Sequence, residues 1–200
     1  ISGILFSCQK EKKDPTIIAN KLASISNSDL ETAVIYEANI RQYSTEGTFE
    51  EFTKDIPEIK KLGVKIIWLM PVFPISETMR KATGGVGSKF ASEFPKEEQS
   101  KYLGSYYAVS DFTKINPEFG TIKDFRKLIK TAHENGIYVI LDWVPNHTGW
   151  DHTWLKTNPD FYTKNDKGEV IYPKDTDWTD VADLNYDNIN LQEAMILDMK

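Results

Sequence analysis

The apolar positions of this chain gather in three mainly apolar runs, at residues 34–40, 64–71 and 138–144. The runs are rich in Val, Ile, Leu and aromatic residues, which predicts strands. The third run shows no alternation of polar and apolar positions, so we expect it to be buried on both faces of a parallel sheet. Apolar residues also recur at helical spacing from about residues 48, 121 and 190, and the last of these patterns continues to residue 200.

Start and stop residues support the first two helical patterns. Thr48 is the expected N-cap of the first, with Glu51 completing a capping box and Gly63 ending the helix. Pro57 falls inside this pattern and predicts a kink or a restart of the helix. Thr121 is the expected N-cap of the second helix. The predicted buried stripes are Phe49, Phe52, Ile56, Ile59 and Leu62 in the first helix, and Ile122, Phe125, Leu128, Ile129 and Ala132 in the second.

The order of the predicted elements is strand, helix, strand, long loop, helix, strand, long loop, helix. The loop at 72–103 is long for a compact domain, and loops of this size are usually functional. Alternating strands and helices favour a parallel α/β fold whose chemistry lies at the carboxyl ends of the strands. A doubly wound sheet would fit the same elements, but no glycine-rich phosphate loop follows the first strand, which weakens a nucleotide-binding interpretation.

Composition adds little beyond a globular class. The 200 residues are 40% hydrophobic and 12% aromatic, and no stretch has the apolar length that a membrane-spanning helix needs. The net charge is −6 and the basic residues are scattered, which argues against a nucleic-acid partner.

Cys8 is the only cysteine, so no intrachain disulfide can form. The apolar residues before it, the small Ser7 and the polar run after it resemble the end of a bacterial lipoprotein signal. The initiator Met and basic leader of such a signal are missing, so we expect the N-terminus to be incomplete. This interpretation predicts an exported protein, periplasmic or at the cell surface, with a lipid anchor at Cys8. The alternatives are a free thiol or a cleaved signal of another kind.

Three polar side chains lie at the end of the third apolar run or directly after it: Asp142, Asn146 and His147. A carboxylate at the end of a buried strand is costly unless it is hydrogen-bonded or paired. Either these residues form a polar site, or Asp142 caps a loop and His147 is an ordinary surface imidazole.

Four segments, in order, resemble the α-amylase family of glycoside hydrolases, which are (β/α)8 barrels. The hexapeptide 142–147 is similar to the family motif Asp-x-Val-x-Asn-His at the end of barrel strand three, and the other segments are 63–71, 107–121 and 182–185. The resemblance covers about residues 34–200. It implies the N-terminal portion of a (β/α)8 TIM barrel with a loop-rich insertion after strand 3. The implied domains are a signal remnant and linker at 1–30, the first three β/α units at 31–147, the inserted region at 148–189, and the start of the next barrel helix at 190–200.

The resemblance also implies a substrate site made of Tyr107, Asp142 and His147. His147 would donate a hydrogen bond to a sugar hydroxyl, and Tyr107 would stack on the apolar face of a glucose unit. Asp142 would mainly hold neighbouring groups in place. The alternatives are a loop histidine that supports the site from behind, and Tyr106 as the stacking ring. Four tryptophans could offer further sugar platforms or pack in a core: Trp143, Trp150, Trp154 and Trp178.

Asn146 and Asp183 match positions that hold Ca²⁺ in many family members. Amide and carboxylate oxygens suit calcium, which takes six to eight oxygen ligands. Asp183 as a plain loop acid is the alternative.

The family's nucleophile and acid/base come from strands four and five, with a third acid after strand seven. No acid of this chain lies in the expected glycine-aromatic-arginine-x-aspartate setting, so we expect no catalytic residue within it. The implied function is a retaining glycoside hydrolase for α-glucans such as starch or maltooligosaccharides, present as an N-terminal fragment inactive alone. The alternatives are a noncatalytic sugar-binding or scaffold protein on the same barrel, and a family transglycosylase or isomerase.

Overall fold

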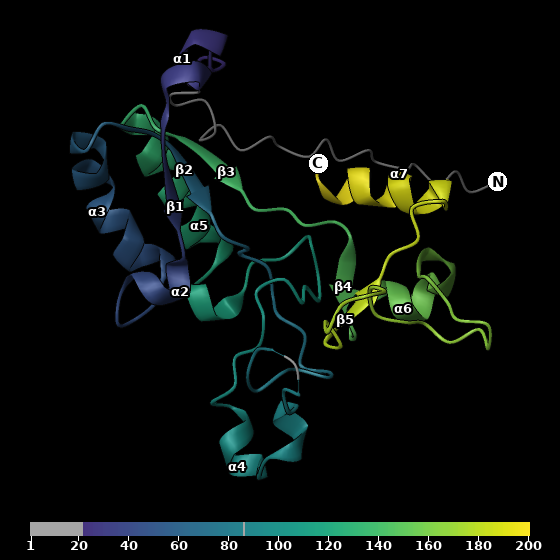
Figure 1. The fold of residues 1–200 in the computed structure, drawn as a ribbon. Coiled ribbons are helices and arrows are strands. Elements are labelled where there is room, and N and C mark those ends of the chain that lie inside the picture. The colour runs from purple at the N-terminus through teal and green to yellow at the C-terminus, as the bar shows by residue number, and fades with distance from the viewer. Residues whose placement is uncertain (1–21, 86) are drawn as a thin grey trace, which may run out of the picture.

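The computed structural model describes residues 22–85 and 87–200, which contain two sheets (Figure 1). The larger is parallel, with the order β1 (Val34–Ala38), β2 (Val64–Leu69) and β3 (Tyr138–Leu141). The smaller pairs β4 (His147–Gly149) with β5 (Val181–Asp183) in antiparallel fashion. Cys8 lies outside the described residues, so the lipid anchor stays a prediction.

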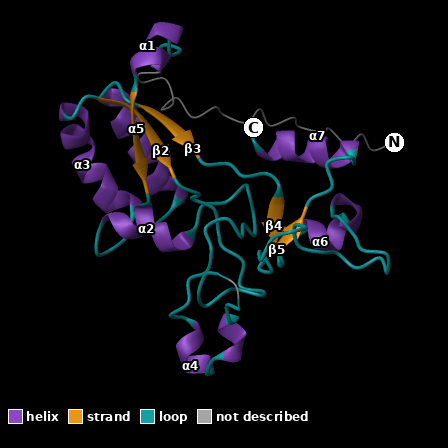
Figure 2. Ribbon diagram, in the orientation of Figure 1, coloured by secondary structure: helices purple, strands orange, loops and turns teal. Residues whose placement is uncertain are grey.

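Two long helices connect the parallel strands. The helix α3 (Phe49–Lys61) joins β1 to β2, and α5 (Ile122–Glu134) lies between β2 and β3 in the chain (Figure 2). The two helices pack against each other and cover the same face of the sheet. None of the helices within the described ranges has the length and apolar character to span a membrane. The other helices are α1 (Asn27–Thr32), α2 (Ile40–Tyr43), η2 (Ala91–Glu93), α4 (Lys96–Gln99), η3 (Pro117–Phe119), α6 (Trp154–Thr157), η4 (Pro159–Phe161) and α7 (Ile189–Asp198).

The first hydrophobic core lies between the parallel sheet and these two helices. Aromatic residues dominate it: the Phe49 ring lies 5.8 Å from Phe119 and 5.4 Å from Phe125, centroid to centroid. Such tilted and edge-on aromatic pairs stabilise a core beyond the area that they bury. The core residues from α3 are those that the helical spacing predicted, except Leu62: Phe49, Phe52, Ile56 and Ile59.

The strand register brings the carboxyl ends of the three strands level. Ala38 pairs with Leu69, and Leu69 pairs with Leu141. Beyond the strands, the Asp142 amide donates to the Leu69 carbonyl at 2.9 Å. Asp142 therefore leaves the sheet at the edge where parallel α/β folds place their chemistry.

The third strand differs from its prediction. It ends at Leu141, and the Ile140 side chain is 45% exposed, so the expectation of burial on both faces is wrong. Within the described residues, β3 is an outer strand of the sheet that pairs with β2. Periodicity records that a strand is apolar but not which neighbours cover it.

Helix ends also differ in detail. Leu62 is 71% exposed and Ile122 is 51% exposed, because they lie at opposite ends of their helices, where the packed face stops. Glu51 does not complete a capping box, since its carboxylate pairs with Lys54 at 2.5 Å. The helix α3 runs through Pro57 without a restart, although Pro57 has no N–H to give to the preceding turn.

A second core supports the smaller sheet. Its centre is the group Phe73, Phe112 and Trp143, in which the Phe112 and Trp143 rings stack with centroids 5.1 Å apart. Residues from β5 and α7 join it, and Leu141 packs against both cores. The chain between β2 and α5 is not structureless, since it forms η2 and α4 at the tip of a protruding loop (Figure 1).

Candidate functional site

The chain that leaves β3 borders a cleft with a volume of about 470 Å³. Its walls come from three separate segments: the loop before residue 109, the stretch from β3 to β4, and the loop that leads into β5. The lining residues are Ser105, Tyr107, Asp142, Val144, Asn146, His147, Trp178, Asp180 and Val181.

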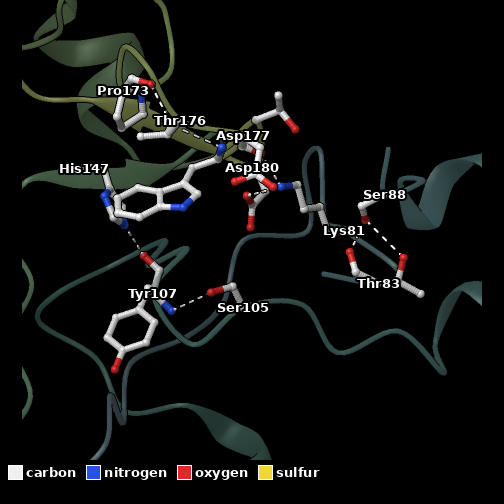
Figure 3. Close-up of polar contacts among 12 residues, drawn as sticks. Lys81, Thr83, Ser88, Ser105, Tyr107, His147, Pro173, Thr176, Asp177 and Asp180 are labelled. Carbon is white, nitrogen blue, oxygen red and sulfur yellow. Dashed lines mark hydrogen bonds and ion pairs between the residues drawn. The ribbon is translucent and has the colours of Figure 1, made fainter. Parts of the chain in front are cut away.

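Tyr107 connects the two ends of the 142–147 segment. Its hydroxyl donates to Asp142 Oδ2 at 3.0 Å. Its carbonyl oxygen lies 3.1 Å from His147 Nε2, a contact that Figure 3 marks with a dashed line. Burial, and then the Asp142 carboxylate, raise the pKa of Tyr107 to about 12, so the hydroxyl stays protonated and remains a donor. The three residues predicted to bind substrate thus meet in one cleft.

The structure also distinguishes the two neighbouring tyrosines. Tyr107 lines the cleft, whereas Tyr106 packs against the first core with the Arg41 guanidinium 4.4 Å from its ring centroid. Tyr107 is therefore the ring that a ligand in the cleft can reach.

His147 is 4% exposed and has a fixed tautomer. A carbonyl oxygen only accepts, so Nε2 must carry the hydrogen that the Tyr107 carbonyl receives. Burial lowers the pKa of His147 despite the opposing effects of the Tyr107 carbonyl and nearby acids, so the ring is neutral near pH 7. Nδ1 is then an acceptor, and it is buried without a partner. In this arrangement the donor capacity of His147 is used inside the protein.

The two predicted calcium ligands lie near the β4–β5 pairing. His147 is the direct cross-strand partner of Asp183, and the Asn146 carbonyl accepts from the Leu184 amide at 3.1 Å. Asn146 lines the cleft but Asp183 does not. Among residues 22–85 and 87–200, no group of three or more His, Cys, Asp or Glu side chains could hold a metal ion. These residues supply two of the six to eight oxygens that calcium takes, which is not a complete site.

One wall of the cleft, formed by Trp178 and Asp180 and called the far wall below, was not predicted as a site. Trp178 is 45% exposed, and its ring lies edge-on to His147 with centroids 5.7 Å apart. Asp180 is 7% exposed and lies 3.6 Å from the Lys81 amino group. No motif marks these positions, although Trp178 was among the tryptophans considered as platforms. The other three pack against the second core: Trp143, Trp150 and Trp154.

His152, to which the sequence assigns no role, is a buried titrating group whose ring lies 5.8 Å from Phe112 and 4.7 Å from Trp154, centroid to centroid. Burial lowers its pKa from 6.5 to about 4, although Asp111 and Asp151 oppose that shift. Its Nδ1 accepts from the Trp154 amide at 3.3 Å. The unfolded chain binds the proton near pH 6.5 and the folded protein only near pH 4, so folding stability falls as the pH drops through that interval.

We therefore expect His152→Asn to remove a pH-dependent loss of about 3 kcal/mol in unfolding free energy between pH 6.5 and 4. Asparagine keeps an acceptor near the position of Nδ1 but does not titrate. Urea unfolding of wild type and variant at several pH values measures this difference. An equal loss of stability in the two proteins would show that His152 does not carry it.

Known proteins resemble this chain in sequence and in fold. The α-amylase catalytic-domain family model matches residues 23–185. The chain is 28% identical over 187 residues to α-amylase 3 of Dictyoglomus thermophilum, covering 82% of this chain and 32% of that protein. It is 30% identical over 201 residues to the trehalose synthase of a Pimelobacter species, covering 82% and 31%. The crystal structure of an α-amylase from Lactobacillus plantarum superposes with a TM-score of 0.74 at 37% identity, covering 86% of this chain and 36% of that one.

The chain thus spans about a third of the length of these relatives. Their fold confirms the predicted class, because β1 to β3 with α3 and α5 correspond to the N-terminal portion of a (β/α)8 barrel. Sequence match, superposition and strand order lead to the same conclusion: the chain belongs to the α-amylase family of glycoside hydrolases and related transferases.

Proposed function

We propose that the whole protein is a retaining glycoside hydrolase that acts on α-glucans such as starch or maltooligosaccharides. The observation that carries the proposal is the meeting of Tyr107, Asp142 and His147 in one cleft at the carboxyl edge of the parallel sheet. Family membership supports the reaction class, and the α-amylases among the relatives support the substrate class.

The cleft suits a glucose unit. The Tyr107 ring offers an apolar face, while its hydroxyl stays occupied by Asp142 and keeps the ring oriented. Asn146 is exposed and can exchange hydrogen bonds with sugar hydroxyls. The indole of Trp178 can cover the ligand from the opposite wall.

Retaining cleavage needs a nucleophile and an acid/base about 5 Å apart. Both acids that line the cleft already have partners: Asp142 accepts from Tyr107, and Asp180 pairs with Lys81. We therefore propose that the two catalytic carboxyl groups come from outside these 200 residues.

This proposal predicts that the whole protein shortens maltopentaose and that the 200-residue chain alone does not. Chromatography of the products, with the anomer followed by NMR from the start of the reaction, measures both hydrolysis and retention. Glucan hydrolysis by the isolated chain would refute the assignment of the catalytic acids, and inversion would refute the mechanism.

A transglycosylase or isomerase is the second candidate, because a trehalose synthase matches this chain at 30% identity. Such an enzyme would rearrange maltose or exchange glucosyl units, and the products would not become shorter on average. A protein that binds maltopentaose without changing it would instead favour a noncatalytic sugar-binding function.

We also propose that the protein is exported with a lipid anchor at Cys8. We propose further that Asn146 and Asp183 are two of the ligands of a calcium ion. Residues 4–8 support the first, and the oxygen donors beside the β4–β5 pair support the second. No step of the reaction is assigned to calcium.

A further inference from the structure

A buried ion pair joins two loops at the far wall of the cleft. The Lys81 amino group lies 3.6 Å from Asp180 Oδ1, and it also donates to the Asp177 carbonyl. The Lys81 and Asp180 side chains are only 12% and 9% exposed. Removing charges from water is costly, and a pair so placed holds its two chain segments in one relative position.

The Lys81 end of this contact is firmly held. Lys81 forms an antiparallel bridge with Phe90, and the Ala82 amide donates to the Lys89 carbonyl at 2.8 Å. The Arg80 guanidinium next to it donates to the Ser76 carbonyl at 2.9 Å. Because its backbone is fixed on both sides, Lys81 can serve as a support for a less constrained segment.

The less constrained segment is the turn that contains Asp177, Trp178 and Asp180. Trp178 lies in the sequence between Asp177 and Asp180, the two residues that Lys81 contacts. Figure 3 shows the Lys81 side chain reaching toward Asp177 and Asp180. The Trp178 side chain is 45% exposed, and its amide donates to Thr176 Oγ1 at 3.2 Å. The indole therefore depends on the backbone of this turn for its place beside His147.

We propose that Lys81 is a positioning residue that sets the affinity for the glucan by holding Trp178 against the cleft. Lys81 is absent from the cleft lining, so it acts through the turn and not on the ligand. The role in substrate binding rests on the proposed function, whereas the effect on Trp178 does not.

The test compares Lys81→Met with Lys174→Met in the whole protein, because Lys174 is an exposed lysine of the loop that carries Trp178. We expect Lys81→Met to raise KM for maltopentaose about tenfold while kcat changes less than about threefold, and Lys174→Met to change neither. Trp178→Ala should raise KM similarly. The double variant of Lys81→Met and Trp178→Ala should have the same KM as Trp178→Ala alone, because both changes remove the same contribution of Trp178 to binding.

A second measurement is independent of catalysis. In protein labelled with 5-fluorotryptophan, the Trp178 signal is assigned by its loss in Trp178→Phe. We expect Lys81→Met to shift and broaden that signal, and Lys174→Met to leave it unchanged. If Lys81→Met does not fold, Lys81→Met with Asp180→Asn removes both charges and should show the same shifted signal and raised KM.

The outcomes separate the two claims. An unchanged Trp178 signal in Lys81→Met overturns the inference. The inference also fails if the KM effects of Lys81→Met and Trp178→Ala multiply in the double variant. A wild-type protein without action on maltopentaose overturns the proposed function and, with it, the role of Lys81 in substrate affinity. The fluorine signal then still decides whether Lys81 places Trp178.

Discussion

Replacing Asp142 with alanine is expected to lower kcat/KM of the whole protein on maltopentaose by about 100-fold, the size typical of losing one preorganised polar group. Asp142 accepts from the Tyr107 hydroxyl at 3.0 Å, and the Tyr107 carbonyl receives the His147 hydrogen bond. Alanine would leave the hydroxyl of Tyr107 without its partner. The substitution would therefore disturb the orientation of the ring as well as removing a charge from the cleft.

Tyr107→Phe is the matched comparison, because it removes the same hydrogen bond and keeps the carboxylate. We expect it to lower kcat/KM only about tenfold, as the loss of one hydrogen bond does. Equal losses in the two variants would mean that Asp142 acts only by holding Tyr107. Thermal melts of both variants check that each is folded. Wild-type activity of Asp142→Ala would show that Asp142 has no role in the reaction.

The largest expected loss of stability at neutral pH comes from Gly149→Ala. A Cβ at this position would lie 2.3 Å from Ser76 Cβ and 2.9 Å from the Ala108 carbonyl oxygen. Ser76 is 1% exposed, so neither neighbour can move without disturbing the packing. We expect a loss of about 3 kcal/mol in unfolding free energy, at the upper end of the usual range for overpacking.

Gly84→Ala is the control for this change, because a Cβ there meets nothing within 4 Å. Gly84 also lacks the positive φ of several other glycines in the chain. Urea unfolding should show a change of less than about 0.5 kcal/mol for Gly84→Ala, as for an ordinary surface substitution. If Gly149→Ala were equally harmless, the close approach of β4 to the loop at Ser76 would be wrong.

The parts of the fold that could be predicted have local signals. Thr121 and Asp124 form a reciprocal capping box at the start of α5, and the N-cap Thr48 accepts from the Glu51 amide at 3.4 Å. The polar group at the end of β3 was predicted from an apolar run that ends in polar residues, although the predicted strand continued past Asp142 to Val144. Each of these depends on residues a few positions apart, which is the range over which sequence patterns are informative.

The far wall of the cleft lacks such a signal. Trp178 and Asp180 face His147 only because β5 pairs with β4, and no spacing in the sequence encodes that pairing. The tautomer of His147 was also beyond prediction, since it depends on the Tyr107 carbonyl. Exposure at Ile140 was missed for a related reason, because burial depends on what packs over a residue.

The separation of the two hydrophobic cores has a consequence for how the protein can evolve. Trp178 lies on a partly exposed loop and belongs to neither core, whereas β1 to β3 pack mainly in the first core, with Leu141 at the end of β3 also touching the second. Mutations in this loop can change which ligand fits while the barrel strands keep their packing, since surface loops tolerate variation better than the elements they connect. The loop can therefore vary in ligand specificity while the sheet and its helices stay constant. Laboratory selection for a new specificity should accumulate substitutions near Trp178 before any appear in α3 or α5.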